Sequence, residues 1–133
     1  MGHRIMQVLL DTHALVWWLE AKESLSRKAK KIIEDSETVV FVSAASGWEL
    51  AIKTQIGKFK SAELVHGLER EIEKEGFIEL PISMEHALLA GSLGSPHKDP
   101  FDRILIAQSM VEGITLVTAD PLVAQYPAPI RMV

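Results

Sequence analysis

The sequence contains no cysteine, which excludes a disulfide framework, a thiolate metal ligand and a thiol nucleophile. It also lacks long apolar runs: the longest, such as ALVWWL at 14–19, fall far short of the ~20 apolar residues that a membrane-spanning helix needs. The opening residues MGHRIMQ contain no apolar stretch before a cleavage site, so we expect no secretory signal. We therefore expect a soluble, cytoplasmic protein with no membrane partner, in which any metal is bound by oxygen or imidazole.

The composition is that of one folded domain. Hydrophobic residues make up 47 % of the chain, which is too many for a disordered protein. A chain of 133 residues is long enough to bury one core and too short for two, so we predict a single domain over 1–133. The formal charge of −4, from 18 acidic and 14 basic residues, argues against a protein that coats nucleic acid non-specifically.

Hydrophobic patterning predicts the fold class. Three apolar, β-branched runs lack the alternation of a strand with one solvated face, which predicts buried parallel strands at 7–11, 39–43 and 115–118. Two weaker runs suit strands nearer an edge, at 77–82 and 130–133. Apolar residues at helical spacing lie between the strands: after Ser26, from 48 to Gly57, and over 64–76, 84–91 and 101–112. This alternation indicates a three-layer α/β/α fold around a mainly parallel sheet.

Four carboxylates lie where such a fold would bring them together. Asp11 ends the first strand, Asp120 follows the strand at 115–118, and Glu49 lies on the helix after the second strand. Asp102 lies at the start of the helix that follows the polar loop 94–100. Ligands bind outside the carboxyl ends of parallel strands, so we expect these acids at one edge of the sheet. Unpaired carboxylates that crowd together repel one another, which favours a bound cation such as Mg²⁺ or Mn²⁺.

Each acid also has an ordinary structural explanation. Asp11 and Asp99 suit the N-caps of the helices that they precede, and Asp120 suits a turn. Glu49 and Lys53 have the spacing of an ion pair on a helix surface. For Asp99 we keep the N-cap prediction. For the other acids, it is the shared location that supports a functional site.

The surroundings of these acids add further expectations. Trp48 and Leu50 flank Glu49 in an apolar helix, which argues against a fully solvated carboxylate. Ser43, at the end of the second strand, suits either a helix cap or a contact to a phosphate or a metal-bound water. The five histidines show no metal-ligand spacing, and no Walker-type, GxGxxG or GxSxG motif occurs.

Four stretches resemble, in order and spacing, the motifs of PIN-domain ribonucleases, specifically the VapC toxins of toxin–antitoxin pairs. They are VLLDTHALVWWL at 8–19, SGWELAIKTQIGK at 46–58, HKDPFDRILIAQ at 97–108 and LVTAD at 116–120. The resemblance implies a PIN-like fold, with the family's four catalytic acids at Asp11, Glu49, Asp102 and Asp120. Asp102 is preferred over Asp99 because it keeps the family's helical offset to ILIAQ, which leaves Asp99 as a supporting neighbour.

The resemblance also implies a chemistry. It is that of a Mg²⁺- or Mn²⁺-dependent endoribonuclease that cuts an RNA phosphodiester to leave a 3′-hydroxyl and a 5′-phosphate. Asp11 and Asp102 would bind most of the metal, and Asp120 would assist them. Glu49 would orient or deprotonate the attacking water.

Substrate contacts and partners follow from the same resemblance. Lys53 and Arg103 are candidates for contacts to the phosphate, or for ion pairs with neighbouring acids. The partners implied are an RNA substrate, a second copy in a homodimer, and a cognate VapB-like antitoxin in a hetero-oligomer. We place the antitoxin groove at Trp17, Trp18 and 53–68.

Two other functions are kept as alternatives. A catalytically inactive PIN-like module would bind RNA or protein, although the presence of all four acids argues against it. A receiver-type phosphoacceptor signalling domain has a similar length and an acidic cluster. It needs an aspartate at the end of its third strand and a late lysine, whereas the run at 39–43 ends in Ser43 and no lysine follows Lys98.

The four site acids also account for the net charge. Removing them from the 18 acidic residues leaves 14, which equals the number of basic residues. The rest of the surface is then formally neutral, with basic residues at 27–31 and 53–60 free to meet an RNA backbone.

Overall fold

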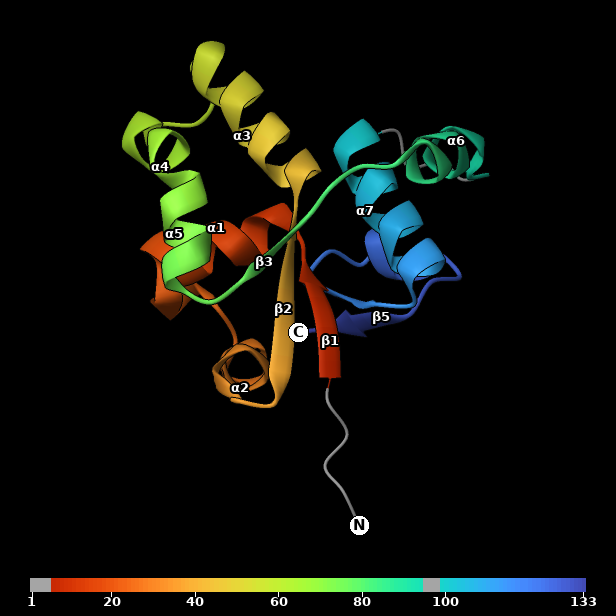
Figure 1. Cartoon of the computed structure of the whole chain (residues 1–133), viewed down its shortest axis with the longest axis horizontal. Coiled ribbons are helices and arrows are strands. Elements are labelled where there is room, and N and C mark those ends of the chain that lie inside the picture. Colours follow the sequence, from red (N-terminus) through yellow and green to blue (C-terminus); the bar gives the residue numbers. More distant parts are fainter. Residues whose placement is uncertain (1–5, 95–98) are drawn as a thin grey trace.

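The computed structural model describes residues 6–94 and 99–133. At its centre lies a sheet of five strands in the order β3-β2-β1-β4-β5, with every neighbouring pair parallel (Figure 1). The strands are β1 (Met6–Leu10), β2 (Thr38–Ser43), β3 (Ile78–Leu80), β4 (Thr115–Thr118) and β5 (Ile130–Met132). The predicted parallel sheet is confirmed. The three apolar runs form its central strands, and the two weaker runs form its edges.

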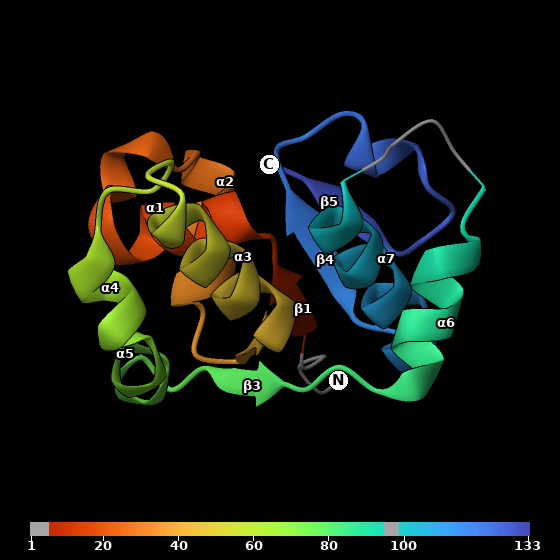
Figure 2. The same ribbon diagram turned by 90° about the horizontal axis from the view of Figure 1, so that it is seen from above.

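Helices cover both faces of this sheet (Figure 2). On one side lie α1 (Thr12–Glu20), α2 (Arg27–Glu34), α4 (Ala62–His66) and α5 (Leu68–Lys74), and on the other lie α6 (Met84–Ser92) and α7 (Pro100–Glu112). Helix α3 (Ala44–Gln55) rises from the end of β2. Two short 3-10 helices, η1 (Lys22–Ser24) and η2 (Val123–Gln125), complete the described elements. No helix in 6–94 or 99–133 is long and apolar enough to cross a membrane.

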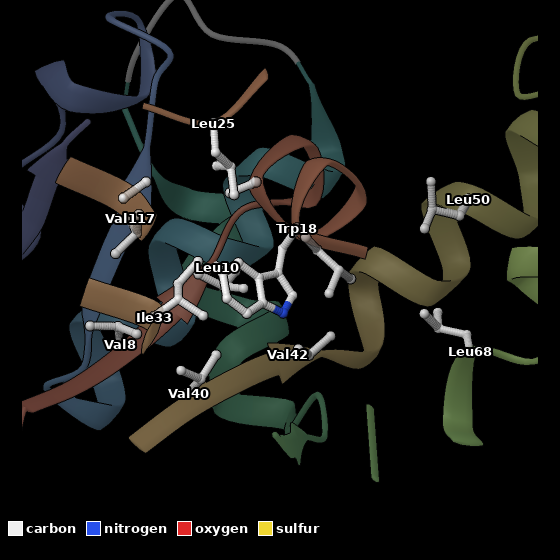
Figure 3. Close-up of a cluster of buried hydrophobic side chains, with 13 residues drawn as sticks. Val8, Leu10, Trp18, Leu25, Ile33, Val40, Val42, Leu50, Leu68 and Val117 are labelled. Atoms are coloured by element: carbon white, nitrogen blue, oxygen red, sulfur yellow. The ribbon is translucent and has the colours of Figure 1, made fainter. Parts of the chain in front are cut away.

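Each face of the sheet has its own hydrophobic core, because successive strand residues point to opposite sides. Val8 and Leu10 of β1 lie in the core that α1, α2 and α5 cover (Figure 3). Leu9 lies in the other core, with Leu105 and Ile106 of α7. These two cores confirm the predicted three-layer α/β/α architecture. The strand order differs from the 2-1-3-4-5 order of receiver-type domains, so that alternative is wrong.

Two helical predictions need correction. The single helix predicted over 64–76 is two helices, α4 and α5, because Gly67 leaves the helical conformation with φ −97° and ψ 8°. In α3 the apolar residues at helical spacing are on the exposed side: Trp48 is 52 % and Ile56 is 59 % exposed. The buried side of α3 carries Glu49 and Leu50 instead. The fold thus turns an acidic side chain of α3 inward.

Candidate functional site

Asp11 lies at the junction of β1 and α1 and is 6 % exposed. It is the N-cap of α1, as predicted: its Oδ1 accepts the N–H of Ala14 at 2.8 Å. Its Oδ2 accepts the hydroxyl of Thr118 at 2.6 Å. The N–H of Asp11 donates to the carbonyl of Val117 at 3.1 Å, so the pairing of β1 with β4 continues to this residue. Capping therefore fixes the carboxylate at the carboxyl edge of the sheet.

The surroundings of Asp11 disfavour its charge. Burial raises the pKa of this carboxyl group, and the charge of Asp120 raises it further. Hydrogen bonds from Thr118 and Ala14 and the charge of His13 act in the opposite direction. A cation beside Asp11 would favour the ionised form that burial opposes.

Thr118 connects Asp11 to Asp120. It is the last residue of β4, is fully buried, and accepts the N–H of Asp120 at 3.0 Å through the same hydroxyl that donates to Asp11. Asp120 in turn accepts the N–H of Leu122 at 2.9 Å, which is the turn role predicted for it. Sequence reasoning missed Thr118, and the available signal was its position two residues before Asp120 at a strand end.

Only one of the two carboxylate oxygens of Glu49, on α3, has a hydrogen-bond partner in the described residues. The residue is 5 % exposed, and its Oε2 accepts the ammonium group of Lys53 at 2.5 Å. Its Oε1 is buried with no hydrogen-bond partner in the described residues. The predicted helical pair is confirmed, although only its lysine lies near the surface, with a side chain 37 % exposed. A buried carboxylate oxygen without a partner costs free energy unless a ligand or water satisfies it.

Two acids at the start of α7, Asp99 and Asp102, act electrostatically on Lys53. The hydrogen bond to Glu49 raises the pKa of Lys53, and the charges of Glu49, Asp99 and Asp102 add to this effect, while burial opposes it. Asp99 caps α7 as predicted, since its Oδ1 accepts the N–H groups of Phe101 at 2.9 Å and Asp102 at 3.2 Å. The ring of Trp48 meets that of Phe101 edge to face at 4.9 Å, so α3 and α7 are in direct contact.

Hydroxyl groups hold the first turns of α1 and α3 together. Thr12 and Ser46 share a buried hydrogen bond of 2.9 Å, which joins the residue after Asp11 to the residue one turn before Glu49. Ser43 accepts the N–H of Ala45 at 2.9 Å and thereby caps α3. Of the two roles expected for Ser43, the structure thus supports the cap.

Arg103 makes hydrogen bonds to two backbone carbonyl groups. Its Nε donates to the carbonyl of Ala90 at 2.9 Å, and its Nη2 donates to that of Leu93 at 2.5 Å. These bonds fasten α7 to the end of α6, and the expected contact of Arg103 to a phosphate stays a prediction. His97 and Lys98, which open the third motif, lie outside the described residues.

The described residues contain no group of three histidine, aspartate or glutamate side chains that could hold a metal ion. The acids instead form two sets: Asp11 with Asp120, and Glu49 with Asp99 and Asp102 around Lys53. Mg²⁺ keeps several waters and needs only one or two carboxylates from a protein. Within 6–94 and 99–133, hard oxygen donors, one of them the Oε1 of Glu49 that lacks a partner there, therefore fit a hydrated divalent cation and do not form a closed cage of protein ligands.

Comparisons with known proteins bear on the fold and the family of this chain. Ribonuclease VapC22 from Mycobacterium tuberculosis is 30 % identical over 114 residues, which cover 85 % of this chain and 86 % of that protein. Among solved structures, VapBC2 from Rickettsia felis, bound to a DNA fragment from its promoter, matches with a TM-score of 0.69 at 15 % identity. It covers 96 % of this chain and 99 % of its own.

A toxin–antitoxin complex from Klebsiella pneumoniae matches with a TM-score of 0.64 at 18 % identity, covering 94 % of this chain and 96 % of its own. At these identities the two structures establish the fold alone. The PIN domain family model matches residues 8–128, which include Asp11, Glu49, Asp102 and Asp120. The chain belongs to the PIN-domain family.

Proposed function

We propose that this chain, as one PIN domain over 1–133, is a metal-dependent endoribonuclease and the toxin of a VapBC-like toxin–antitoxin pair. The observation that carries the proposal is the pair of buried carboxylates at the carboxyl edge of a PIN fold, Asp11 and Glu49. The ribonuclease name of the relative from Mycobacterium tuberculosis supports the reaction class.

In this proposal Asp11, Asp102 and Asp120 hold Mg²⁺ or Mn²⁺. When bound, such a cation polarises a phosphoryl oxygen and makes a bound water more acidic. Thr118 keeps the carboxylate of Asp11 in one orientation through its 2.6 Å hydrogen bond. Glu49 orients the attacking water and accepts its proton, a role that suits its Oε1, which has no hydrogen-bond partner in the part of the chain that the structure describes.

The remaining candidate residues divide by their contacts. Lys53 stays the proposed phosphate contact, since its ammonium group is beside the acids and partly exposed. Ser43 acts through the cap of α3, and Asp99 acts through the cap of α7. Arg103 donates to carbonyl groups at the end of α6, and its contact to the phosphate stays a prediction.

Cleavage of defined RNAs by the purified chain in Mg²⁺ or Mn²⁺ tests the proposal. We expect Asp11→Asn and Asp102→Asn to lower the cleavage rate about 100-fold or more. Asp35→Asn is the matched control and should leave the rate unchanged. Asp35 precedes β2 and so lies at the end of the sheet where this strand starts, opposite the end that carries the site acids. Cleavage by the two site variants at the parental rate, or no cleavage of any RNA class by antitoxin-free protein, would contradict it.

The proposed partners are RNA, a second copy of the chain and a VapB-like antitoxin. Trp18 is buried and its Nε1 donates to Glu75 at 2.7 Å, which removes it from the expected antitoxin groove. Trp17 stacks on the exposed ring of His13 at 5.7 Å and stays a candidate. Light scattering after size-exclusion chromatography should give a dimer for the chain alone and a larger complex after coexpression with a VapB-like protein. A monomer under both conditions would count against these partners.

A second candidate function is a catalytically inactive PIN-like module that binds RNA or protein. The ion pair of Lys53 with Glu49, which neutralises one of the four acids without a metal, favours it. The two candidates differ in the cleavage experiment, since an inactive module binds RNA without cutting it.

A further inference from the structure

We propose that the ammonium group of Lys53 is the counter-ion of the site acids in the metal-free protein, and that it competes with a divalent cation for these acids. This inference rests on the proposed metal-dependent function. It concerns how the metal-free protein keeps its acids together, and what must move when the metal arrives.

The backbone fixes where Lys53 can act. The residue lies in the last turns of α3, and its carbonyl accepts the N–H groups of Lys58 at 2.7 Å and Phe59 at 3.0 Å. One turn earlier on the same face is Glu49, whose Oε2 lies 2.5 Å from the Lys53 Nζ. The side chain has four rotatable bonds and is 37 % exposed, so its head can leave the pocket while its backbone stays in place.

One of the charges around this ammonium group, that of Asp102, belongs to a proposed ligand of the metal. The carboxylates of Glu49, Asp99 and Asp102 all interact electrostatically with Lys53, and they come from two different helices. These three carboxylates carry a formal charge of −3, of which the ammonium group neutralises one unit, so a cation meets more negative charge once Lys53 has withdrawn. With Lys53 still in place, the cation would be attracted by the acids and repelled by the lysine.

Glu49 shows that the lysine satisfies the pocket incompletely. One of its carboxylate oxygens holds Lys53, and the other is buried without a partner in the described residues. Lysine is a point charge that reaches one oxygen at a time, whereas a hydrated cation presents several water protons to both oxygens. Release of Lys53 would also free a positive charge near the position of an RNA phosphate.

Mn²⁺ binding to the full chain without RNA tests the inference, by calorimetry. Lys53→Gln keeps a hydrogen-bond donor for Glu49 and removes the charge, so we expect Mn²⁺ to bind about tenfold tighter than to the parent. Lys53→Arg keeps the charge and should bind as the parent does. Lys28→Gln removes an exposed lysine from α2, at the other end of the molecule from α3, and should have no effect (Figure 1).

The outcomes separate this inference from the proposed function. Equal or weaker Mn²⁺ binding by Lys53→Gln would overturn the counter-ion role and leave the metal site standing. Absence of Mn²⁺ binding in the parent and in every variant would overturn both. Thermal unfolding in EDTA checks that Lys53→Gln is folded, and we expect a cooperative transition. With Mn²⁺ in place of EDTA, the unfolding temperature of Lys53→Gln should rise more than that of the parent.

Discussion

The hydroxyl group of Thr118, at the end of β4, fixes the positions of Asp11 and Asp120 through two hydrogen bonds. It is fully buried, donates to Asp11 and accepts from the N–H of Asp120. Thr118→Val keeps the shape and leaves both partners unsatisfied. We expect the free energy of unfolding in urea, measured in EDTA, to fall by about 2 kcal/mol.

Thr118→Ser is the control for this substitution, because it retains the hydroxyl group and should keep most of the lost stability. The Val variant should also cleave RNA more slowly than the Ser variant, since Asp11 loses its orientation. A Val variant as stable as the parent would show that the hydrogen bonds of Thr118 contribute nothing.

Asp11 gives the fold a pH dependence whose sign is fixed. Burial raises its pKa above the ordinary value of 3.8, so the folded chain holds this proton more tightly than the unfolded chain. Its contribution to stability is therefore fully present below that value and is lost as the pH rises through the folded pKa. In EDTA, Asp11→Asn cannot ionise, so its stability relative to the parent should rise as the pH increases above 3.8.

Urea unfolding at several pH values measures this difference, with the exposed Asp35→Asn as the control for loss of a carboxylate. A stability gap between Asp11→Asn and the parent that stays constant across the range would contradict the assignment.

Side chains with local roles could be predicted from the sequence, and those with distant partners could not. The caps at Asp11 and Asp99 depend on residues two or three positions away. The bond from Thr118 to Asp11 joins residues 107 positions apart, and no local pattern encodes it. The same holds for Arg103, which donates to the carbonyls of Ala90, 13 residues earlier in α6, and of Leu93, 10 residues earlier and just after that helix.

Among the helices, α7 ends at a glycine that its geometry requires. Gly113 has φ +68°, a left-handed conformation that disfavours other residues, so Gly113→Ala should cost about 1 kcal/mol. Gly91 lies in α6 with open space around the position of a Cβ atom, and Gly91→Ala should stabilise the fold by about 0.5 kcal/mol. Thermal unfolding of both variants tests the contrast, and an equal effect at the two glycines would contradict it.

The existence and order of the elements could be predicted because hydrophobic spacing and strand runs are strong signals. Which face of a helix is buried was less predictable. In α3 the fold buries Glu49 and exposes Trp48, because Ala45 and Leu50 pack in the two cores and set the orientation of the helix. The break at Gly67 was missed because apolar spacing continues across it from Leu64 to Leu68.

For the molecule as a whole, metal binding should appear as stability. A cation that binds only the folded chain stabilises it by about 2.7 kcal/mol at a concentration 100 times its dissociation constant. We expect Mn²⁺ to raise the unfolding temperature of the parent, EDTA to reverse the rise, and Asp11→Asn to show little of it. An Asp11→Asn variant that responds to Mn²⁺ as fully as the parent would remove Asp11 from the metal site.

The charge balance of the whole chain is less simple than its composition suggests. The sequence predicts basic residues at 53–60 free to meet RNA, but Lys53 is paired with Glu49. Composition counts charges without distances, and the pairing depends on the helical geometry of α3. Lys53 is therefore free to meet RNA only when Glu49 has another cation.

The contact between Trp48 and Phe101 has an optical consequence. It joins the two helices that carry Glu49 and Asp102, and Trp48 is half exposed to solvent. Indole fluorescence depends on such surroundings, so a variant in which Trp48 is the sole tryptophan would emit a signal from the rim of the site itself. Stopped-flow mixing with Mn²⁺ would then follow the arrival of the metal in real time, without RNA and without a label.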